Sequence, residues 1–317
     1  MTNPRISAAI CTFNRSTYLV DAIESLAQQT LERAQYEIII VDNNSTDGTN
    51  YVVDSAIKQH PDVSIRYVNE SIQGLSAARN RATRQAQGDY VAYLDDDAHA
   101  DPTWLATVLD AFQKLQPTPA CVGGRIYPDW DGGIPEWVPQ QFLSLYSFLD
   151  HGENVLRLNE HADQCYLNGA NMAFLKNLIN DDYKFSNNLG RKGTSLLSGE
   201  ETEVIRKLIR DGHSVYYLPE SVVWHTVLPD RQKKSYLVRR IIGDGTAQVI
   251  LDMQEKRLSQ RQLPYRIVYD GRGAIYWLVK AMGSWLLNRR EHAFRYLLTS
   301  AQKYGRAQME LKTFLNR

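Results

Sequence analysis

Short apolar runs alternate with longer stretches of helical periodicity from the N-terminus to about residue 130. This alternation predicts βα units around a largely parallel central sheet that is flanked by helices, an α/β domain. The near-continuous apolar run at 38–41 indicates a strand buried on both faces. We expect strands at 5–12, 37–42, 64–68, 90–94 and 120–126, with helices at 17–29, 49–59, 75–86 and 102–115.

The pattern changes after this region. Residues 128–163 are rich in Pro, Gly and Trp and predict an insertion over one end of the sheet, whose aromatic side chains line a binding cleft. The remainder of the chain beyond residue 225 has helical periodicity. In between we expect a strand pair at 165–174, a loop at 186–199, a helix at 200–211 ended by Gly212, and strands at 215–218 and 222–225.

Composition places the chain among ordinary globular proteins of about two structural units. Its 317 residues are 43% apolar and 23% charged, which excludes disordered, collagen-like and disulfide-scaffold classes. The net charge of zero conceals a division at residue 230. Residues 231–317 carry 18 basic and 6 acidic side chains, a net charge of +12, and the part up to residue 230 carries −12. A basic tail of this kind suits a membrane, a nucleic acid or the acidic domain itself.

Cysteine usage and apolar runs bear on the compartment. Cys11, Cys121 and Cys165 are odd in number and form no CxxC pair, which indicates reduced thiols in the cytoplasm. The apolar run at 6–11 is too short for a signal-peptide core. The most apolar later stretch, 274–287, is also short and has Lys280 inside it. Because a spanning helix needs about 20 residues, we expect no transmembrane helix.

Polar side chains gather where three predicted strands end. Because the carboxyl ends of parallel strands meet at one edge of a sheet, these segments are expected to form one rim, where ligands bind in open α/β sheets. Residues 42–49 alone also fit a turn followed by a helix cap. The three segments are Cys11-Thr12-Phe13-Asn14-Arg15, Asp42-Asn43-Asn44-Ser45-Thr46-Asp47-Gly48-Thr49 and Asp95-Asp96-Asp97.

The run Asp95-Asp96-Asp97 has the strongest chemical signal. Three adjacent carboxylates after a buried strand repel one another, and Mg²⁺ or Mn²⁺ between carboxylates and substrate phosphates would neutralise them. A solvated acidic turn is the alternative. Neither GxGxxG after a strand nor GxxxxGK[ST] occurs, so metal charge, Arg15 and Arg79 are the means available to hold phosphates. Arg79 follows a helix start at Gly74, which suits a diphosphate, although a surface role is also open.

Seven segments together resemble glycosyltransferase family 2, whose members have the GT-A fold. They run in family order over about residues 5–225, and although each motif alone is weak, the set is specific. The segments are CTFNR (11–15), EIIIVDNNSTDGT (37–49), GLSAARN (74–80), GDYVAYLDDD (88–97), NGANMAF (168–174), SGEETEVIRKLIRDG (198–212) and VYYLPESVVWH (215–225). The resemblance implies a catalytic domain at 1–230, with a nucleotide-binding half at 1–127 and an acceptor half at 128–230, and a basic helical region at 231–317.

The same resemblance implies an activity and a site. The activity is transfer of a sugar from a nucleotide diphosphate donor, with UDP expected, to an acceptor hydroxyl with inversion, in polysaccharide or other cell-surface glycan synthesis. The implied metal ligands are Asp95, Asp97 and His225, although a structural role for His225 at a strand end is also open. Implied donor contacts are Thr12, Asn14, Arg15, Asp42, Asn44, Arg79, Asp95 and Asp96. The implied acceptor or sugar pocket consists of Asn168, Gly169, Asn171 and Glu200.

The implied catalytic base is Glu201. The family usually has Glu-Asp where this chain has Glu200-Glu201, so the base carries an extra methylene here. A nucleotidyltransferase, or a catalytically inactive carbohydrate-binding or scaffold protein on the same fold, remains as an alternative. The absence of a QxxRW motif and of spanning segments disfavours a processive synthase.

The basic tail adds a hypothesis about location. Aromatic and basic residues are interleaved there, as in helices that lie on anionic membranes. We therefore expect a cytoplasmic protein, peripheral at the inner face of the plasma membrane, that uses a glycan or lipid-linked acceptor and binds no nucleic acid. A cap on the acidic domain or a homo-oligomer interface is the alternative. The residues in question are Tyr265, Tyr276, Trp277, Trp285, Leu286, Leu287 and Phe294.

Overall fold

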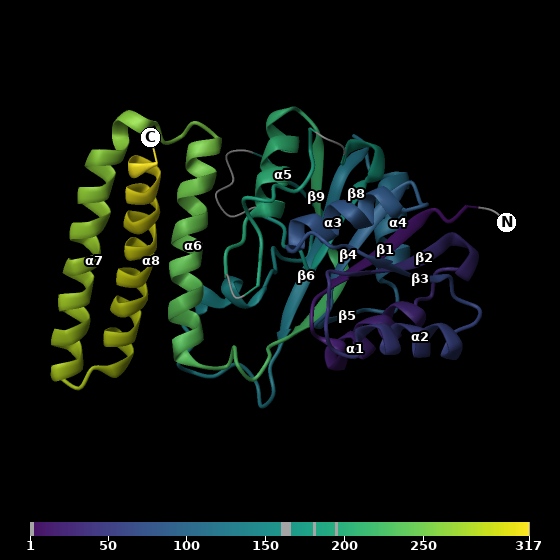
Figure 1. The fold of residues 1–317 in the computed structure, drawn as a ribbon, viewed down its shortest axis with the longest axis horizontal. Coiled ribbons are helices and arrows are strands. Elements are labelled where there is room, and N and C mark those ends of the chain that lie inside the picture. Colours follow the sequence, from purple (N-terminus) through teal and green to yellow (C-terminus); the bar gives the residue numbers. More distant parts are fainter. Residues whose placement is uncertain (1–2, 160–165, 180–181, 194–195, 317) are drawn as a thin grey trace. The chain divides into compact units, whose positions relative to one another are not determined.

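The computed structural model describes residues 3–159, 166–179, 182–193 and 196–316 (Figure 1). The chain divides into two compact units. The first, here called the sheet unit, comprises Met1–Asp131, Tyr146–Asn188 and Glu200–Thr226. The second, the helical unit, comprises Gly132–Leu145, Leu189–Gly199 and Val227–Arg317. Two segments expected in the catalytic domain, 132–145 and 189–199, thus group with the C-terminal helices.

Within the described residues of the sheet unit, nine strands form one mixed sheet. The strand order is β3-β2-β1-β4-β8-β6-β9-β5, and β7 pairs with β9. Strands β1 to β4 are mutually parallel, whereas β8 is antiparallel to both of its neighbours. The strands are β1 Ile6–Thr12, β2 Tyr36–Asp42, β3 Ile65–Asn69, β4 Tyr90–Asp95, β5 Ala98–Ala100, β6 Pro119–Asp129, β7 Leu156–Arg157, β8 Asn171–Leu175 and β9 Ser214–Thr226.

The helices of the sheet unit follow the sequence pattern closely. Helix α5 ends as predicted at Gly212, whose φ of 88° favours glycine, and His213 N donates to Leu208 O at 2.9 Å. Four short 3-10 helices complete the described secondary structure of both units. The α-helices are α1 Ser16–Ala27, α2 Thr49–Gln59, α3 Leu75–Gln85, α4 Trp104–Lys114 and α5 Glu200–Arg210, and the 3-10 helices are Arg33–Gln35, Gln140–Tyr146, Lys176–Leu178 and Gln260–Gln262.

The structure differs from the predicted elements in three places. Residues 215–225 form one continuous strand, β9, because its pairing with β6 resumes after Pro219 with a register shift. The short strands β5 and β7 were not predicted, since such short segments carry no periodicity. Of the strand pair expected at 165–174, only β8 is seen, and Cys165 lies outside the described residues; Cys11 and Cys121 are free thiols.

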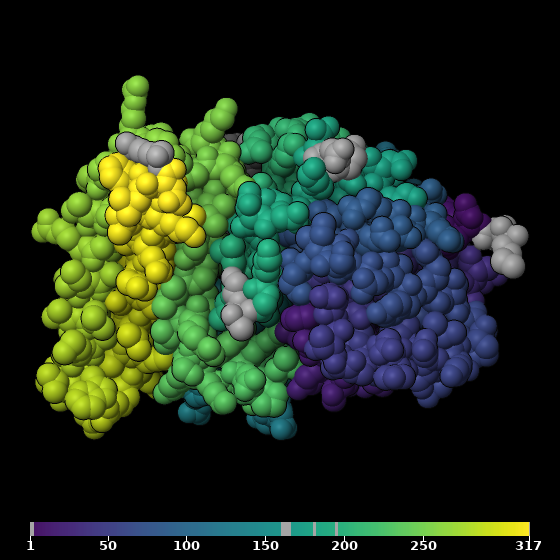
Figure 2. All heavy atoms as spheres, in the orientation of Figure 1, coloured from purple at the N-terminus to yellow at the C-terminus, as the bar shows by residue number. Residues whose placement is uncertain are grey.

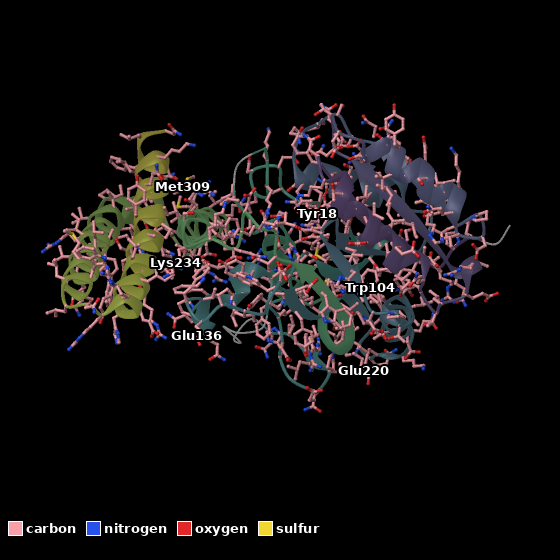
Figure 3. The ribbon with its side chains drawn as sticks, turned by 90° about the horizontal axis from the view of Figure 1, so that it is seen from below. Tyr18, Trp104, Glu136, Glu220, Lys234 and Met309 are labelled. Carbon is pink, nitrogen blue, oxygen red and sulfur yellow. The ribbon has the colours of Figure 1, made fainter. Side chains whose placement is uncertain are left out.

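The core of the sheet unit lies between the sheet and its helices. Trp104 on α4, labelled in Figure 3, is fully buried. Its indole Nε1 donates to Asn171 Oδ1 at 2.8 Å. Every residue of β2 is buried, which confirms the inference drawn from its continuous apolar run.

Three long helices build most of the helical unit. They are α6 Lys234–Gln254, α7 Leu263–Leu286 and α8 Arg290–Leu315. Helix α8 packs against both α6 and α7 and lies between them (Figure 1). Part of the predicted insertion, residues 132–145, belongs to this unit, where the Trp137 ring lies 6.0 Å from the Phe294 ring and Lys234 Nζ is 5.9 Å from the Trp137 ring. The described residues of the insertion on either side of this segment belong to the sheet unit. A search of the described helices finds no membrane-spanning candidate.

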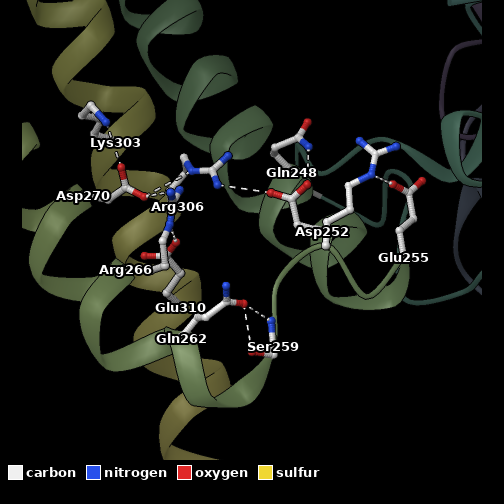
Figure 4. A network of polar contacts seen from close by, with 11 residues as sticks. Gln248, Asp252, Glu255, Ser259, Gln262, Arg266, Asp270, Lys303, Arg306 and Glu310 are labelled. Carbon is white, nitrogen blue, oxygen red and sulfur yellow. Dashed lines mark hydrogen bonds and ion pairs between the residues drawn. The ribbon is translucent and has the colours of Figure 1, made fainter. Parts of the chain in front are cut away.

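A buried ionic network joins the three helices (Figure 4). The carboxylate of Asp270 on α7 is 1% exposed and accepts from Lys303 Nζ at 2.8 Å and Arg266 Nη2 at 3.0 Å. Arg306 spans the network, with Nε 3.3 Å from Asp270 Oδ2 and Nη2 3.2 Å from Asp252 Oδ2 on α6. Burial raises the pKa of Asp270, but the Lys303 hydrogen bond and the three cations outweigh it, so the pKa is lowered overall. The charged form of Asp270 therefore stabilises the helical unit.

We expect Asp270→Asn to lower the free energy of unfolding of the helical unit by about 3 kcal/mol, because three cations lose a buried partner. The lowered pKa means that this stabilisation is present above the pKa of an unfolded aspartate, about 3.9, and is lost as the pH falls through the folded value. Urea unfolding followed by circular dichroism from pH 7 down to pH 3 measures both effects. Asp110→Asn, which breaks an exposed pair with Lys114, is the control and should cost under about 1 kcal/mol. Equal losses in the two variants would contradict the role of Asp270.

Candidate active site

Three strand ends meet at one rim of the sheet, as the sequence predicted. Thr12 at the end of β1 lies opposite Asp42 at the end of β2, and Cys11 lies opposite Asp95 at the end of β4. The parallel register therefore brings the segments after β1, β2 and β4 together, although long stretches of sequence separate them.

Arg15 bridges two carboxylates of the acidic run. Its Nη1 lies 2.8 Å from Asp96 Oδ1 and 2.8 Å from Asp97 Oδ2. Arg15 is the N-cap residue of α1, shortly after the end of β1, and from there its side chain reaches the acidic run. Burial raises the pKa of Asp96, and the charge of Arg15 opposes this effect without cancelling it. Arg15 thus supplies part of the positive charge that the acidic run was expected to need.

Strand pairing brings His225 to the acidic run from a distant part of the chain. Ala98 on β5 pairs with His225 on β9, and Thr226 N donates to Asp97 O at 2.8 Å. His225 Nε2 consequently lies 3.2 Å from Asp97 Oδ1 and 3.6 Å from Asp95 Oδ2. Because β5 follows Asp97 immediately, its pairing with β9 sets the positions of Asp97 and His225 relative to each other.

Asp95, Asp97 and His225 fit a divalent cation. Each offers one ligand atom, and these atoms lie within 4.8 Å of one another. Two carboxylate oxygens and one imidazole nitrogen are donors that suit Mn²⁺ or Mg²⁺ better than a soft metal. Burial raises the pKa of Asp95, but the His225 hydrogen bond and the Arg79 charge outweigh it, so the pKa is lowered and the carboxylate stays charged.

Arg79 on α3 connects the acidic run to α5. Its Nη1 lies 2.7 Å from Glu200 Oε1, and its Nη2 lies 3.4 Å from Asp95 Oδ1. The guanidinium is 3% exposed and lies 5.6 Å from the centre of the Phe185 ring. A Cβ at Gly169 would overlap Arg79 Nη2, so this glycine leaves the space that the guanidinium occupies. The predicted surface alternative for Arg79 is therefore wrong.

The first two residues of α5 are glutamates whose side chains have different surroundings. Glu200 is buried, and burial together with the neighbouring Glu201 raises its pKa to about 8 despite Arg79. Glu201 is half-buried, and its Oε2 has no hydrogen-bond partner among the described residues. Oε2 of Glu200 likewise has no hydrogen-bond partner among those residues, so the two glutamates differ in their burial and in the ion pair that Glu200 Oε1 makes with Arg79.

Hydrogen bonds connect the turn after β1 to the turn after β2. Asn14 has a positive φ of 52°, and its Oδ1 accepts from Thr46 N at 2.7 Å. Asp42 is buried, with Oδ1 accepting from Ser45 N and Oδ2 accepting from Tyr67 Oη at 2.6 Å. Asn44 is exposed at the tip of the turn. These contacts order the rim where a nucleotide base was expected.

Sequence reasoning gave no individual role to two residues that shape this part of the rim. Asn43 Oδ1 accepts from Gly74 N at 2.7 Å, and Asn43 Nδ2 donates to the carbonyl groups of Glu70 and Ile72. It thereby fixes the loop that leads into α3 and Arg79. Tyr67, the hydroxyl partner of Asp42, belongs to β3. The only sequence signal for the role of Asn43 was its position next to Asp42. Nothing in the sequence indicated the role of Tyr67.

The predicted sugar-pocket residues separate into two groups. Asn168 and Gly169 lie in the turn before β8, where Asn168 Oδ1 accepts from Ala170 N at 3.0 Å. Asn171 is fully buried, and both ends of its amide are satisfied by Trp104, Ser221 and the Arg125 carbonyl. Both polar atoms of its side chain bind neighbouring protein groups and link β8 to β6 and β9, so Asn171 has a structural role here instead of the expected place in the pocket.

A sheet of this order, with an acidic run after β4 and a late histidine beside it, is the GT-A architecture of nucleotide-sugar-dependent glycosyltransferases. The profile of Glycosyl transferase family 2 matches residues 7–178, more than half of the chain. The chain belongs to this family, as its motifs indicated, and it is a glycosyltransferase.

Similar proteins and solved structures are consistent with this family assignment. The chain is 28% identical over 267 residues to a glucosyl-dolichyl phosphate glucuronosyltransferase of Haloferax volcanii, covering 82% of each chain. It is 26% identical over 242 residues to the succinoglycan biosynthesis protein ExoM of Rhizobium meliloti, covering 76% of this chain and 72% of that one. Among solved structures, the mannosyltransferase PcManGT of Pyrobaculum calidifontis, in complex with GDP-Man and Mn²⁺, has a TM-score of 0.60 at 19% identity, covering 96% of this chain and 88% of that one.

Proposed function

We propose that this family 2 glycosyltransferase transfers a sugar from a nucleoside diphosphate sugar to an acceptor hydroxyl, with inversion and with a divalent cation. The observation that carries the proposal is the cluster of Asp95, Asp97 and His225, whose ligand atoms lie within 4.8 Å of one another at the rim. Similarity to a mannosyltransferase solved with GDP-Man and Mn²⁺ supports it, and so does similarity to S. aureus TarS solved with UDP-GlcNAc, at a TM-score of 0.55 and 15% identity.

Each half of the reaction has residues suited to it. A cation bound by Asp95, Asp97 and His225 would offset the negative charge that develops on the departing diphosphate. The guanidinium of Arg79, held by Glu200 and Asp95, would contact the diphosphate or ribose. Arg15 fixes Asp96 and Asp97 in position. The nucleotide base of the donor would lie against the turn after β2, which includes Asp42 and Asn44. Thr12 and Asn14 would contact the donor from the neighbouring turn after β1.

Glu201 is the proposed general base. Arg79 engages the neighbouring Glu200, which leaves Glu201, at the position of the family's base, as the carboxylate that accepts the proton of the acceptor hydroxyl. A single displacement of this kind needs no covalent intermediate and inverts the anomeric centre. Glu200 is proposed as a positioning residue that acts through Arg79, with Asn168 and Gly169 lining the sugar pocket.

The acceptor is proposed to be a glycan or a lipid-linked sugar of a cell-surface polymer. The names of the Haloferax and Rhizobium relatives support this class of acceptor. The free thiols Cys11 and Cys121 support a cytoplasmic location.

A donor screen tests the proposal. Purified protein is incubated with UDP- and GDP-linked sugars in Mn²⁺, in Mg²⁺ or in chelator, and release of the nucleoside diphosphate is measured. We expect release from a small subset of donors in metal and none in chelator. Pyrophosphate release from a nucleoside triphosphate and a sugar phosphate would instead indicate a nucleotidyltransferase. Absence of release and of donor binding by calorimetry would favour a catalytically inactive protein.

A further inference from the structure

Helix α7 uses one face to pack within the helical unit. Ser300 Oγ on α8 donates to Ala274 O at 2.7 Å, and the Trp277 ring lies 5.3 Å from the Tyr296 ring. The alternating spacing of four and three residues along this face is typical of a helix packed along one partner. The residues of the packed face are Leu263, Ile267, Asp270, Ala274, Trp277 and Ala281.

The opposite face of α7 is apolar and exposed. Ile275, Val279 and Met282 are 60% to 65% exposed, and Leu286 is 75% exposed. The spacing of these four residues places them in one stripe, which we call the outer face of α7. In Figures 1 and 2, α7 is the outermost of the three helices of its unit, and no other segment of that unit covers it in this view. A contiguous apolar stripe, unlike a single exposed residue, marks an interaction surface.

Aromatic side chains lie beside this stripe. Tyr265, Tyr276 and Trp285 are each more than half exposed. Tyrosine and tryptophan are enriched where a protein meets the boundary between lipid tails and water, because their rings are apolar at one end and polar at the other. Trp277 and Phe294, which the sequence grouped with them, are instead part of the packing within the helical unit.

The charge around the outer face is positive. Residues 256–290 carry eight basic side chains and a single acidic one, Asp270. Asp270 is buried and paired with cations inside the unit, so it offers no negative charge to a partner. Arg272 and Lys280 are exposed on α7, and Lys280 Nζ lies 5.1 Å from the centre of the Tyr276 ring. Long basic side chains beside an apolar stripe can reach lipid headgroups while their stems cover apolar surface.

We propose that the outer face of α7 docks on an anionic membrane surface, with the helix lying in the plane of the interface. The stripe enters the boundary region, and Arg272 and Lys280 contact anionic headgroups. A second copy of the chain is a poorer occupant, because a two-fold interface would bring two faces of the same positive charge together. The inference does not rest on the proposed reaction, although docking would bring the enzyme to lipid-linked acceptors.

Vesicle flotation of the full chain tests this surface. The vesicles contain phosphatidylcholine alone or with about 30 mol % phosphatidylglycerol. We expect binding to the anionic vesicles alone, and weaker binding as salt is raised. Val279→Gln with Met282→Gln, and separately Arg272→Glu with Lys280→Glu, should each reduce the bound fraction at least about tenfold. The matched control is Val20→Gln with Ile57→Gln, which changes two exposed apolar residues of the sheet unit and should bind like wild type.

Two outcomes would overturn the proposal. The first is no binding to anionic vesicles, or equal binding by all variants while circular dichroism shows them folded. The second is a wild-type dimer in sedimentation experiments that the glutamine variant dissociates while vesicle binding persists, which would make the outer face a dimer interface. Release of nucleoside diphosphate without vesicles should be unchanged in the α7 variants, so loss of docking is distinguishable from failure of the proposed reaction.

Discussion

Asp97→Asn is expected to reduce metal-dependent sugar transfer by at least about 100-fold. Asp97 Oδ1 lies 3.2 Å from His225 Nε2 and belongs to the proposed ligand cluster, and an amide removes the negative charge that would hold the cation. Affinity for Mn²⁺, measured by calorimetry in the presence of nucleoside diphosphate, should fall along with turnover.

Asp89→Asn is the matched control, because Asp89 is an exposed aspartate immediately before the opposite end of the same strand, β4. It should leave both metal affinity and turnover at the wild-type level. Wild-type turnover of Asp97→Asn, or full activity of the unaltered enzyme in chelator, would contradict the metal-dependent mechanism.

Glu201→Gln should lower the transfer rate by about 10²-fold to 10⁴-fold while donor and metal affinity stay close to wild type. The amide has nearly the same shape but cannot accept the acceptor proton. Donor affinity should persist because Arg79, the proposed diphosphate contact, is held by Glu200 and Asp95 rather than by Glu201. Single-turnover transfer and donor titration measure the two quantities separately.

Variants of the neighbouring glutamates sharpen this test. Glu203→Gln changes the same helix at another position and should cost little in rate. Glu200→Gln should weaken donor binding, because its carboxyl group holds Arg79 at 2.7 Å. If Glu203→Gln abolished transfer and Glu201→Gln did not, the base would be misassigned even though the family assignment stands.

Local sequence patterns were sufficient for the half of the site that follows parallel strands. The sequence predicted that Arg15, Asp42 and Asp95 lie at one rim, because each follows or ends a buried strand and the carboxyl ends of parallel strands lie side by side. The packing of Arg79 could not be predicted in the same way. Its partner Glu200 is far away in sequence, and the space at Gly169 depends on a turn from a third part of the chain.

Other features of the site depend on long-range pairing, which local sequence patterns do not specify. The proximity of His225 to Asp97 depends on β5, a strand too short for periodicity to reveal, although the family resemblance indicated it. Asn171 was placed in a pocket because the segment 168–171 matches a family segment that lines the donor sugar and acceptor site. Its burial beside Trp104 depends on which helix covers that end of the sheet, which local sequence does not specify.

The alternation of the chain between its two units has a consequence for synthesis. Residues 189–199 lead directly into the helix that carries Glu201, yet they group with the helices at 227–317, which are synthesised after it. Ser198 Oγ accepts from Arg240 Nη1 at 3.0 Å, and Arg240 Nη1 also donates to Leu196 O at 2.9 Å. A nascent chain that ends near residue 230 therefore lacks Arg240, which holds the segment that precedes α5 and the proposed base Glu201. Activity should appear only after α6 has been translated and folded, so prematurely terminated chains would be inactive.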